Sequence, residues 1–357
     1  YEIGVRLVGS EMCIRDSPKI LYHWRAIENS TALSSNNKEY STKSSLKALH
    51  EHYKRTYSNM SPYQLPNGYF GSINNQKNFP SVTIIIPTRN GGQVLNRCIH
   101  SIVDKTAYDN YEIVIIDNNS DDGETLNLLE DFKSKISNLK VLVDTSPFNF
   151  SAINNKAAKS VNSKVLVFLN DDTEILEKSW LSELAAHSIR KEIGAVGGKL
   201  LYPNGTIQHA GVILGIGGVA GHAFRTFRED YSGQMNRANL IHNVSAVTGA
   251  CLAIENQKFL SVGGFDEKKL AVAFNDVDIC LKLLNKGYRN LYLPQVKLLH
   301  HESYSRGMED NPVKQARFSR ETQTMKKRWN LILKNDPCYN PNLTLSDEQF
   351  NIKDCST

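Results

Sequence analysis

The sequence predicts an α/β protein built on a doubly wound, mainly parallel sheet. Between residues 82 and 190, apolar and β-branched runs alternate with amphipathic segments, as is typical of strand–helix units in parallel sheets. The run Val165-Leu-Val-Phe-Leu169 is apolar at every position, as in a strand that is buried on both faces. A chain of 357 residues with 40% hydrophobic and 22% charged residues has an ordinary globular composition.

Each element of this sheet is predicted from its local pattern. Apolar residues between 91 and 104 recur at helical spacing, and Ser151 is placed to cap a later helix. The predicted strands are 82–86, 111–116, 141–143, 165–169 and 194–196. The predicted helices are 44–57, before the sheet, and then 91–104, 125–136, 151–161 and 180–190.

Beyond residue 198 the alternation ends, and a smaller mixed region is expected beside the sheet. Residues 199–247 are rich in glycine and irregular in pattern. The later elements that we predict are strand 250–254, turn 263–264, helix 277–284, strands 290–293 and 296–299, and an amphipathic helix at 315–329.

Four segments are expected along the chain. Residues 1–17 show no useful periodicity and resemble a translated sequencing adapter, so we interpret them as non-native. Residues 18–78 are expected to form an N-terminal extension that ends in an Asn- and Gly-rich linker at 67–80. The main domain is expected at 79–345 and a C-terminal tail at 346–357. Because no Met begins the sequence, we expect it to start inside a longer protein.

The bulk properties indicate a compartment and a class of partner. Six scattered cysteines without a CxxC pair predict a reduced, cytoplasmic protein. The net charge of +5 and the pI near 8.7 suit an anionic substrate or a membrane surface. No apolar run reaches the roughly 18 residues that a membrane-spanning helix needs, so we expect any membrane contact to be peripheral.

Polar side chains follow the buried strand at 165–169. Asn170, Asp171 and Asp172 come directly after it, and ligands of open α/β sheets bind at the carboxyl ends of the strands. Their oxygen atoms suit a hard divalent cation, which in turn suits a diphosphate. The alternative is that both aspartates cap the next helix.

Two further strand ends carry polar loops that are expected on the same edge. Gly91 and Gly92 would let the backbone after the first strand approach a ligand. Asp117, after the second strand, can accept a hydrogen bond from the imide N–H of a base. The alternatives are a plain strand-to-helix turn and an Asx turn with helix capping.

Two sites late in the sequence carry residues suited to catalysis and to metal binding. Asp276 lies at a predicted helix start, where a carboxylate stays ionised and can take a proton from a hydroxyl. The alternative is N-capping by Asn275 or Asp276. His300 and His301 follow a short strand, and imidazole is a common metal ligand, although a histidine at a strand end is usually structural.

The Gly-rich run at 211–220 imitates a dinucleotide-binding fingerprint. Gly215-x-Gly217-x-x-Ala220 matches that motif by letter. No clear helix follows it, and no later strand ends in an acid at the usual spacing. We therefore reject an NAD site and expect a loop that shapes an acceptor cleft.

As a set, the motifs resemble those of the glycosyltransferase family 2 domain with the GT-A fold, over residues 80–345. They most resemble the branch of O-antigen and surface-polysaccharide assembly that includes rhamnosyltransferase-like proteins, and the run Gln208-His-Ala-Gly211 is similar to that branch too. The matching motifs are Ile84-Ile-Ile-Pro-Thr-Arg-Asn90, Ile116-Asp-Asn-Asn-Ser120, Phe168-Leu-Asn-Asp-Asp-Thr-Glu174, Gly263-Gly-Phe-Asp-Glu267, Phe274-Asn-Asp-Val-Asp-Ile-Cys280 and His300-His-Glu-Ser303.

The resemblance implies a role for each motif residue. Asp172 and His300 would bind the metal, and Asp276 would be the catalytic base. The nucleotide would contact Thr88, Asn90, Asp117, Asn119, Asn155 and Asp171. The sugar and acceptor pocket would contain Thr248, Gly249, Ala250, Asp278 and His301. Asn170 and Asn275 depart from the family pattern, because many members carry an acid at these positions.

The resemblance also implies an inverting, metal-dependent sugar transfer. Mg²⁺ or Mn²⁺ would neutralise the leaving diphosphate while Asp276 deprotonates the acceptor hydroxyl. The donor would be dTDP-rhamnose or a UDP-sugar, and the acceptor a glycan or a lipid-linked saccharide. Nucleic acid is not expected as a partner. A lipid-linked acceptor would bring the protein to the inner face of the plasma membrane.

Two other functions would suit a sheet of this kind. A non-catalytic GT-A-like module that binds or assembles glycans would tolerate Asn170 and Asn275. A nucleotidyltransferase would need a longer Gly-rich loop after the first strand than residues 87–92, which also lack Lys. Residues 21–40 resemble the segment before this domain in longer relatives, so an upstream domain, such as a second transferase, is expected.

Overall fold

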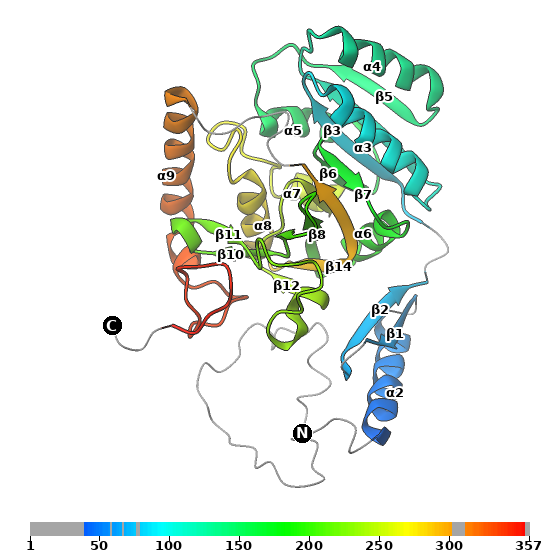
Figure 1. Cartoon of the computed structure of the whole chain (residues 1–357), viewed down its shortest axis with the longest axis vertical. Helices are drawn as coiled ribbons and strands as arrows, with labels where there is room; N and C mark the ends of the chain where they lie inside the picture. The colour runs from blue at the N-terminus through cyan, green and yellow to red at the C-terminus, as the bar shows by residue number, and fades with distance from the viewer. Residues whose placement is uncertain (1–38, 58, 66–67, 76–78, 302–310, 354–357) are drawn as a thin grey trace.

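The computed structural model describes residues 39–57, 59–65, 68–75, 79–301 and 311–353. The prediction for residues 1–17 lies outside these ranges. A ten-stranded sheet forms the centre, with eight strands in the order β12-β14-β8-β13-β6-β3-β4-β5, β7 paired to β14 and β9 paired to β8 (Figure 1). No helix in the described ranges has both the length and the apolar character needed to cross a membrane.

One half of the sheet is parallel, as the sequence predicts. The strands of this half pair in the order β5-β4-β3-β6. They are β3 (Val82–Thr88), β4 (Tyr111–Asp117), β5 (Leu139–Val143) and β6 (Val165–Leu169). The connecting helices are α3 (Gly92–Lys105), α4 (Gly123–Lys135), α5 (Phe150–Ser160) and α6 (Trp180–Ser188). Asn149, not Ser151, caps α5, because its side chain accepts from the N–H of Ala152.

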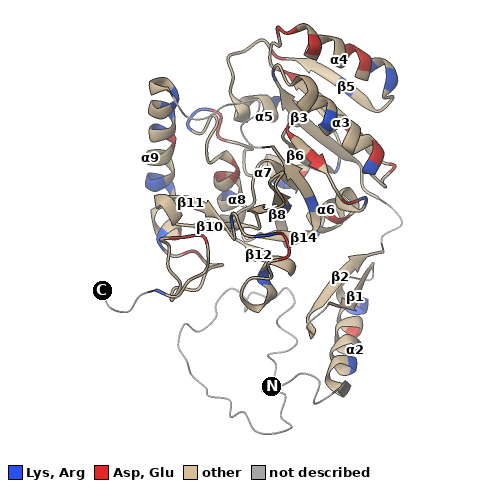
Figure 2. Ribbon diagram, in the orientation of Figure 1, with Lys and Arg blue, Asp and Glu red and all other residues tan. Residues whose placement is uncertain are grey.

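Helices cover both faces of this half. Ile84 and Ile86 of β3 belong to a core that includes apolar residues of α3, α4 and α6, whereas Ile85 belongs to the core on the other face. That second core includes residues of α5, α7 (Asn256–Ser261) and α8 (Asn275–Asn285). The sheet is therefore doubly wound. Helix α4 carries both acidic and basic residues along its length (Figure 2). Among them, Lys133 pairs with Glu130 at 2.6 Å.

The other half of the sheet is mixed. Strand β13 (Cys251–Glu255) runs antiparallel to both β6 and β8 (Ile193–Leu201), and β14 (Arg289–His300) runs parallel to β8. It follows that β6, β8 and β14 end at one edge. The two strands expected at 290–293 and 296–299 form the single strand β14, with a register shift between Leu293 and Lys297. The remaining strands of the sheet are β7 (Thr173–Ile175), β9 (Ile207–His209) and β12 (His242–Val244).

Residues 199–247 are more regular than the sequence suggests. Besides β9 and β12 they contain β10 (Val212–Leu214), β11 (Ala220–His222) and the 3₁₀ segments η4 (Ile216–Gly218) and η5 (Gln234–Asn239). The dinucleotide-like run forms the turn between the antiparallel strands β10 and β11. Gly215 adopts a φ of +91° there, which glycine tolerates best. The run is therefore a hairpin turn and not the strand-to-helix turn of a dinucleotide site.

The N-terminal extension forms a helix and a hairpin that pack on the main domain (Figure 1). These elements are α2 (Glu39–Thr56), β1 (Met60–Gln64) and β2 (Phe70–Asn74). The prediction of a linker is therefore wrong at β2. The hydroxyl of Tyr57 donates to Glu192 Oε1 at 2.7 Å, and the guanidinium of Arg190 lies 4.2 Å from the centre of the Tyr57 ring. Both contacts lie near the start of β8.

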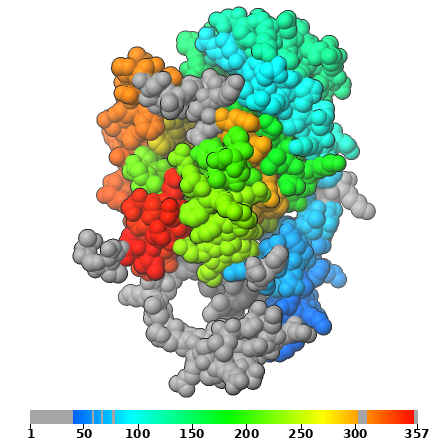
Figure 3. Space-filling model, viewed as in Figure 1, coloured from blue at the N-terminus to red at the C-terminus, as the bar shows by residue number. Residues whose placement is uncertain are grey.

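The described residues after α9, 335–353, pack against the domain and do not form a free tail. Helix α9 (Pro312–Lys334) is longer than the predicted 315–329. After it, Phe350 stacks on Phe224 with a ring separation of 4.5 Å, and the N–H of Phe224 donates to the carbonyl of Glu348 at 2.9 Å. Figure 3 shows this segment in red, next to yellow-green residues on the visible face. The prediction of a tail is wrong for residues 346–353.

Candidate functional site

Three loops meet where β3, β4 and β6 end. The hydroxyl of Thr88 donates to Asp171 Oδ2 at 2.6 Å, and both residues are buried. The N–H of Asn118 donates to the carbonyl of Thr88 at 2.9 Å. A Cβ atom on Gly91 would lie 2.6 Å from Thr88 Oγ1 and 3.1 Å from Asp171 Oδ2. Only glycine therefore lets the first loop approach Asp171 this closely.

Asn90 links the first loop to the second. Its amide nitrogen donates to Asp121 Oδ1 at 2.7 Å, and its amide oxygen accepts from the N–H of Asp121 at 2.9 Å. Asp117 is buried, and its Oδ1 accepts from the N–H of Ser120. Asn119 is exposed, with a φ of +62°. The loops therefore place Thr88, Asn90, Asp117, Asn119 and Asp171 along one edge.

The Asx-turn and capping alternatives hold for part of the second loop. The bond from Ser120 to Asp117 is an Asx turn. Asp122 caps α4 by accepting from the N–H of Thr125 at 2.8 Å. That hydrogen bond lowers the pKa of the Asp122 carboxyl. Asp122 therefore caps α4, whereas Asp117 forms the turn before it and does not cap the helix.

Asp171 and Asp172 do not cap a helix, because strand β7 follows them. Asp172 is 4% exposed, and its Oδ1 lies 3.0 Å from Nε2 of His300. That oxygen accepts no hydrogen bond within the described part of the chain. The N–H of His301 donates to the carbonyl of Asp172 at 2.9 Å, which ties the end of β14 to the turn after β6. A carboxylate and an imidazole from distant segments thus face each other at the sheet edge.

The facing pair fits a divalent cation. Two ligands of one octahedral cation with bonds of about 2.1 Å lie roughly 3 Å apart, which matches the separation of Asp172 Oδ1 and His300 Nε2. The Asn170 amide nitrogen also lies 3.3 Å from Nε2. No group of three His, Cys, Asp or Glu side chains that could hold a metal occurs among the residues that the structure describes. Further ligands would have to come from a diphosphate and water.

Asp276 lies at the same edge, at the start of α8. Its Oδ2 accepts from the N–H of Gly249 and its Oδ1 from the N–H of Val277, both at 2.8 Å. The carboxylate is half-buried, so it remains reachable. The N-cap residue of α8 is Phe274, with a φ of +59°, so the expected capping by Asn275 or Asp276 is not found. Asp276 therefore fits the position of a general base.

The segment 248–250 connects Asp276 to the turn after β6. Its Gly249 donates to Asp276, and the carbonyl of Ala250 accepts from the N–H of Asn170 at 3.1 Å. Thr248 is half-buried beside them. This segment enters β13, and since β13 is antiparallel to β6, its first residues lie next to the last residues of β6. The antiparallel strand thus brings Thr248, Gly249 and Ala250 to the turn that carries Asp172.

Three of the residues expected in the site hold other parts of the fold. The amide of Asn155 is paired with both backbone groups of Phe265, at 2.9 Å each. The Nε2 atom of His301 pairs with Glu174 Oε1 at 2.7 Å. His300, the last residue of β14, faces Asp172, whereas His301, the residue after the strand, is paired with Glu174. The structure brings neither Asn155 nor His301 to the facing pair.

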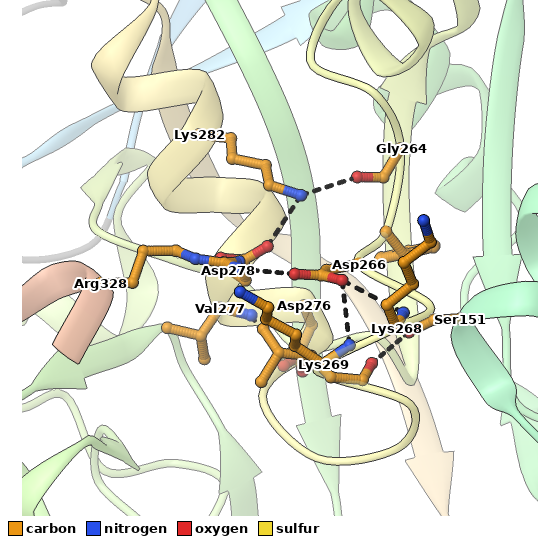
Figure 4. A network of polar contacts seen from close by, with 12 residues as sticks. Ser151, Gly264, Asp266, Lys268, Lys269, Asp276, Val277, Asp278, Lys282 and Arg328 are labelled. Atoms are coloured by element: carbon orange, nitrogen blue, oxygen red, sulfur yellow. Dashed lines mark hydrogen bonds and ion pairs between the residues drawn. The ribbon is translucent and has the colours of Figure 1, made fainter. Parts of the chain in front are cut away.

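Asp278 is the third expected site residue that holds another part of the fold. It is fully buried and accepts from Arg328 Nη1 at 2.7 Å and from Trp329 Nε1 at 2.9 Å. Arg328 also reaches Asp266 Oδ2 at 2.5 Å, and Lys282 pairs with Asp278 at 2.9 Å (Figure 4). Asp278 therefore anchors α9 to α8 and does not line a sugar pocket.

Glu321 of α9 is a residue that the sequence does not single out. It is 3% exposed, and its two carboxylate oxygens accept from the N–H groups of Val272 and Ala273 at 3.0 Å each. These bonds hold the loop that leads to Asp276. In the sequence, Glu321 is one charged residue of an amphipathic helix and carries no other signal. A groove of about 1050 Å³ between α8 and α9, lined by Tyr288 and Trp329 among others, contains none of the expected site residues.

The mainly parallel sheet with helices on both faces is the GT-A fold. One structure that resembles the chain is GalNAc-T7 with UDP, GalNAc and Mn²⁺ (TM-score 0.59, 17% identity, 73% of this chain and 50% of that chain). Another is the mannosyltransferase PcManGT of Pyrobaculum calidifontis with GDP-Man and Mn²⁺ (TM-score 0.51, 15% identity, 87% and 83%). The predicted GT-A fold is confirmed.

Residues 83–259 match the family described as Glycosyl transferase family 2, and the chain contains a domain of that family. It is 43% identical over 335 residues to the protein y4gI of Sinorhizobium fredii and 35% identical over 352 residues to the O-antigen biosynthesis protein RfbC of Myxococcus xanthus. These alignments cover 93% and 97% of this chain, but only 37% and 27% of the relatives. It is also 27% identical to the O-antigen chain rhamnosyltransferase WbaN of Salmonella anatum, over 63% of this chain and 68% of that protein.

Proposed function

We propose that the chain transfers a sugar from a nucleotide-diphosphate sugar to a hydroxyl acceptor, with inversion and with Mg²⁺ or Mn²⁺ as cofactor. The observation that carries this proposal is the facing pair of Asp172 and His300, joined through segment 248–250 to the carboxylate of Asp276. Two proteins of the same fold were solved with Mn²⁺ and a nucleotide or nucleotide-sugar, which supports the choice of cofactor and donor class.

In this reaction the chain would bind, orient and accept a proton. Asp172 and His300 would hold the cation, whose chemistry is to neutralise the leaving diphosphate. The loops with Thr88, Asn90 and Asp117 would orient the nucleotide. Asp276 would accept the proton of the acceptor hydroxyl. At the same time, the hydroxyl oxygen would bond to the anomeric carbon, and the bond from that carbon to the diphosphate would break. A single displacement of this kind inverts the anomeric carbon.

The family branch supports a proposal for the donor and the acceptor. We propose dTDP-rhamnose or a UDP-sugar as donor and a glycan or lipid-linked saccharide of surface-polysaccharide or O-antigen synthesis as acceptor. The names of RfbC and WbaN support this class. Such an acceptor would place the protein in the cytoplasm, with peripheral contact at the inner face of the plasma membrane.

The test is calorimetric titration of UDP, dTDP and GDP into the full chain, with and without Mn²⁺. We expect one nucleotide to bind in a metal-dependent manner, and Asp172→Ala to lose that dependence. The matched control is Asp230→Ala, which removes an exposed carboxylate that pairs with Arg228 at 2.9 Å and is not among the expected site residues. Absence of nucleotide binding in the unmodified chain would contradict the proposal.

A non-catalytic glycan-binding module is the second candidate, and Asn170 and Asn275 are its motivation. The amide of Asn275 is buried and donates to the carbonyl of Val272 at 2.9 Å, so its role is structural whichever function holds. Metal-dependent nucleotide binding without hydrolysis or transfer from any offered donor would favour the module.

A further inference from the structure

Gln208 lies at an irregular position of the sheet. Strand β9 pairs with β8 through Leu200 with His209 and Leu201 with Ile207, so one residue of β9 is skipped. That residue is Gln208, which makes it the extra residue of a β-bulge. A bulge redirects the side chain of its extra residue, and bulges occur often beside active sites.

The bulged residue contacts His300. Gln208 is 4% exposed, and its Oε1 lies 2.6 Å from Nδ1 of His300. An amide oxygen only accepts hydrogen bonds, so Nδ1 must carry the proton in this contact. The other ring nitrogen, Nε2, then presents its lone pair beside Asp172 Oδ1. The contact therefore selects the tautomer in which Nε2 can bind a cation.

We propose that Gln208 is a positioning residue, which fixes the Nδ1-protonated tautomer of His300 and aims Nε2 at the cation. This inference rests on the proposed function, because a tautomer preference matters to catalysis only if His300 binds a metal. Partners of this kind orient metal-binding histidines, and their loss weakens metal affinity by about 10–100-fold. Without Gln208, the carboxylate of Asp172 would draw the proton to Nε2 and occupy the lone pair that the cation needs.

The experiment uses the full chain and three variants. Gln208→Leu removes the acceptor, and Gln208→Glu keeps an oxygen at that position. Gln295→Leu is the matched control, because Gln295 is a partly buried glutamine of β14 whose amide donates to Glu183 at 3.2 Å. Nitrogen NMR of ¹⁵N-labelled histidine, with His300 assigned by its loss in His300→Asn, reports the tautomer. Electron paramagnetic resonance of Mn²⁺ with added UDP or dTDP reports metal affinity.

We expect the unmodified chain, Gln208→Glu and Gln295→Leu to show the Nδ1-protonated signature. In Gln208→Leu the signature should move to Nε2, and Mn²⁺ affinity should fall by about 10–100-fold. An unchanged tautomer in Gln208→Leu would overturn the proposal. Equal losses in Gln208→Leu and Gln208→Glu would overturn it as well, because they would indicate a role in packing.

The two proposals fail in different ways. If the unmodified chain binds neither Mn²⁺ nor a nucleotide, the proposed function fails. The NMR signatures of the metal-free proteins still decide whether Gln208 controls the tautomer, because that measurement needs no ligand.

Discussion

Asp171 and Asp172 are consecutive residues with different surroundings, and this difference separates their chemistry. Asp171 accepts a hydrogen bond from Thr88, which belongs to the first loop. Asp172 turns instead to His300, and its Oδ1 accepts no hydrogen bond within the described ranges. A hydrogen-bonded carboxylate can brace a loop, whereas one that faces an imidazole lone pair is suited to a cation. Asp172 is therefore the residue at which we expect metal dependence to be lost.

The charge of Asp276 should matter for the rate and not for nucleotide binding. In Asp276→Asn we expect transfer to fall by about 10²–10⁴-fold, because the amide cannot accept a proton from the acceptor hydroxyl. Transfer is measured with the donor identified by calorimetry, and nucleotide affinity in the same preparation. Asp230→Asn is the control. A variant that keeps the full rate would remove Asp276 from the role of base.

At the scale of elements, α9 holds the loop that leads to Asp276 in place. Glu321 accepts from the N–H groups of Val272 and Ala273. Arg328 joins Asp278 to Asp266 (Figure 4). Burial would raise the pKa of Asp266, but the hydrogen bond and charge of Arg328 outweigh it, so the pKa is lowered. Helix α9 therefore stabilises the loop before Asp276 through Glu321, and it is joined to Asp266 and Asp278 through Arg328.

Removal of Asp278 should destabilise the fold. Asp278→Ala would leave Arg328 and Lys282 without their buried partner, and breaking a buried ion pair costs about 3–5 kcal/mol. We take about 3 kcal/mol as the expected loss, because both cations are partly exposed. Urea unfolding measures it, with Asp230→Ala as the exposed control, expected to lose less than about 1 kcal/mol. Unchanged stability with weaker acceptor binding would return Asp278 to the acceptor pocket.

The elements that the sequence predicts best are those with a long local pattern. The parallel strands and their helices repeat their apolar residues at strand or helix spacing, and β6 is apolar throughout. The antiparallel direction of β13 has no such signal, because a strand has the same pattern in either direction. Strands of three residues, such as β9, are too short to show a period.

For the candidate site, the sequence predicts residues at the ends of strands and helices better than residues whose place depends on distant contacts. Thr88, Asp117, Asp171, Asp172, Asp276 and His300 lie at strand or helix ends, and the structure brings these ends to one edge. The sequence could not separate His300 from His301, because the choice depends on the end of β14 at His300 and on the distant partners of the two imidazoles, Asp172 and Glu174. The positions of Asn155 and Asp278 depend on contacts with distant residues, Phe265 and Arg328, which no local pattern reveals.

At the scale of the whole molecule, a buried histidine links stability to pH. His187 is 1% exposed, and burial, together with the nearby charge of Arg190, lowers its pKa to about 3. The ordinary value is 6.5. Between these values the unfolded chain binds a proton that the folded chain excludes. The contribution of His187 to stability is therefore complete above pH 6.5 and is lost as the pH falls toward 3.

This linkage predicts a difference in slope. Below pH 6.5 the unfolding free energy of the unmodified chain should fall by about 1.4 kcal/mol per pH unit more steeply than that of His187→Gln. Urea unfolding between pH 4.5 and 8 measures both slopes. Equal slopes would show that folding does not lower the pKa of His187.

The position of β13 limits how this domain can evolve. Residues 248–250 contact Asn170 on one side and Asp276 on the other, directly before a strand that is hydrogen-bonded along both of its edges. One residue inserted or deleted there would turn every following side chain of β13 to the opposite face. It would also separate Asp276 from the turn that carries Asp172. Lineages that diversify their substrates are therefore expected to vary the length of exposed loops, such as residues 225–233, while the spacing from Thr248 to Glu255 stays constant.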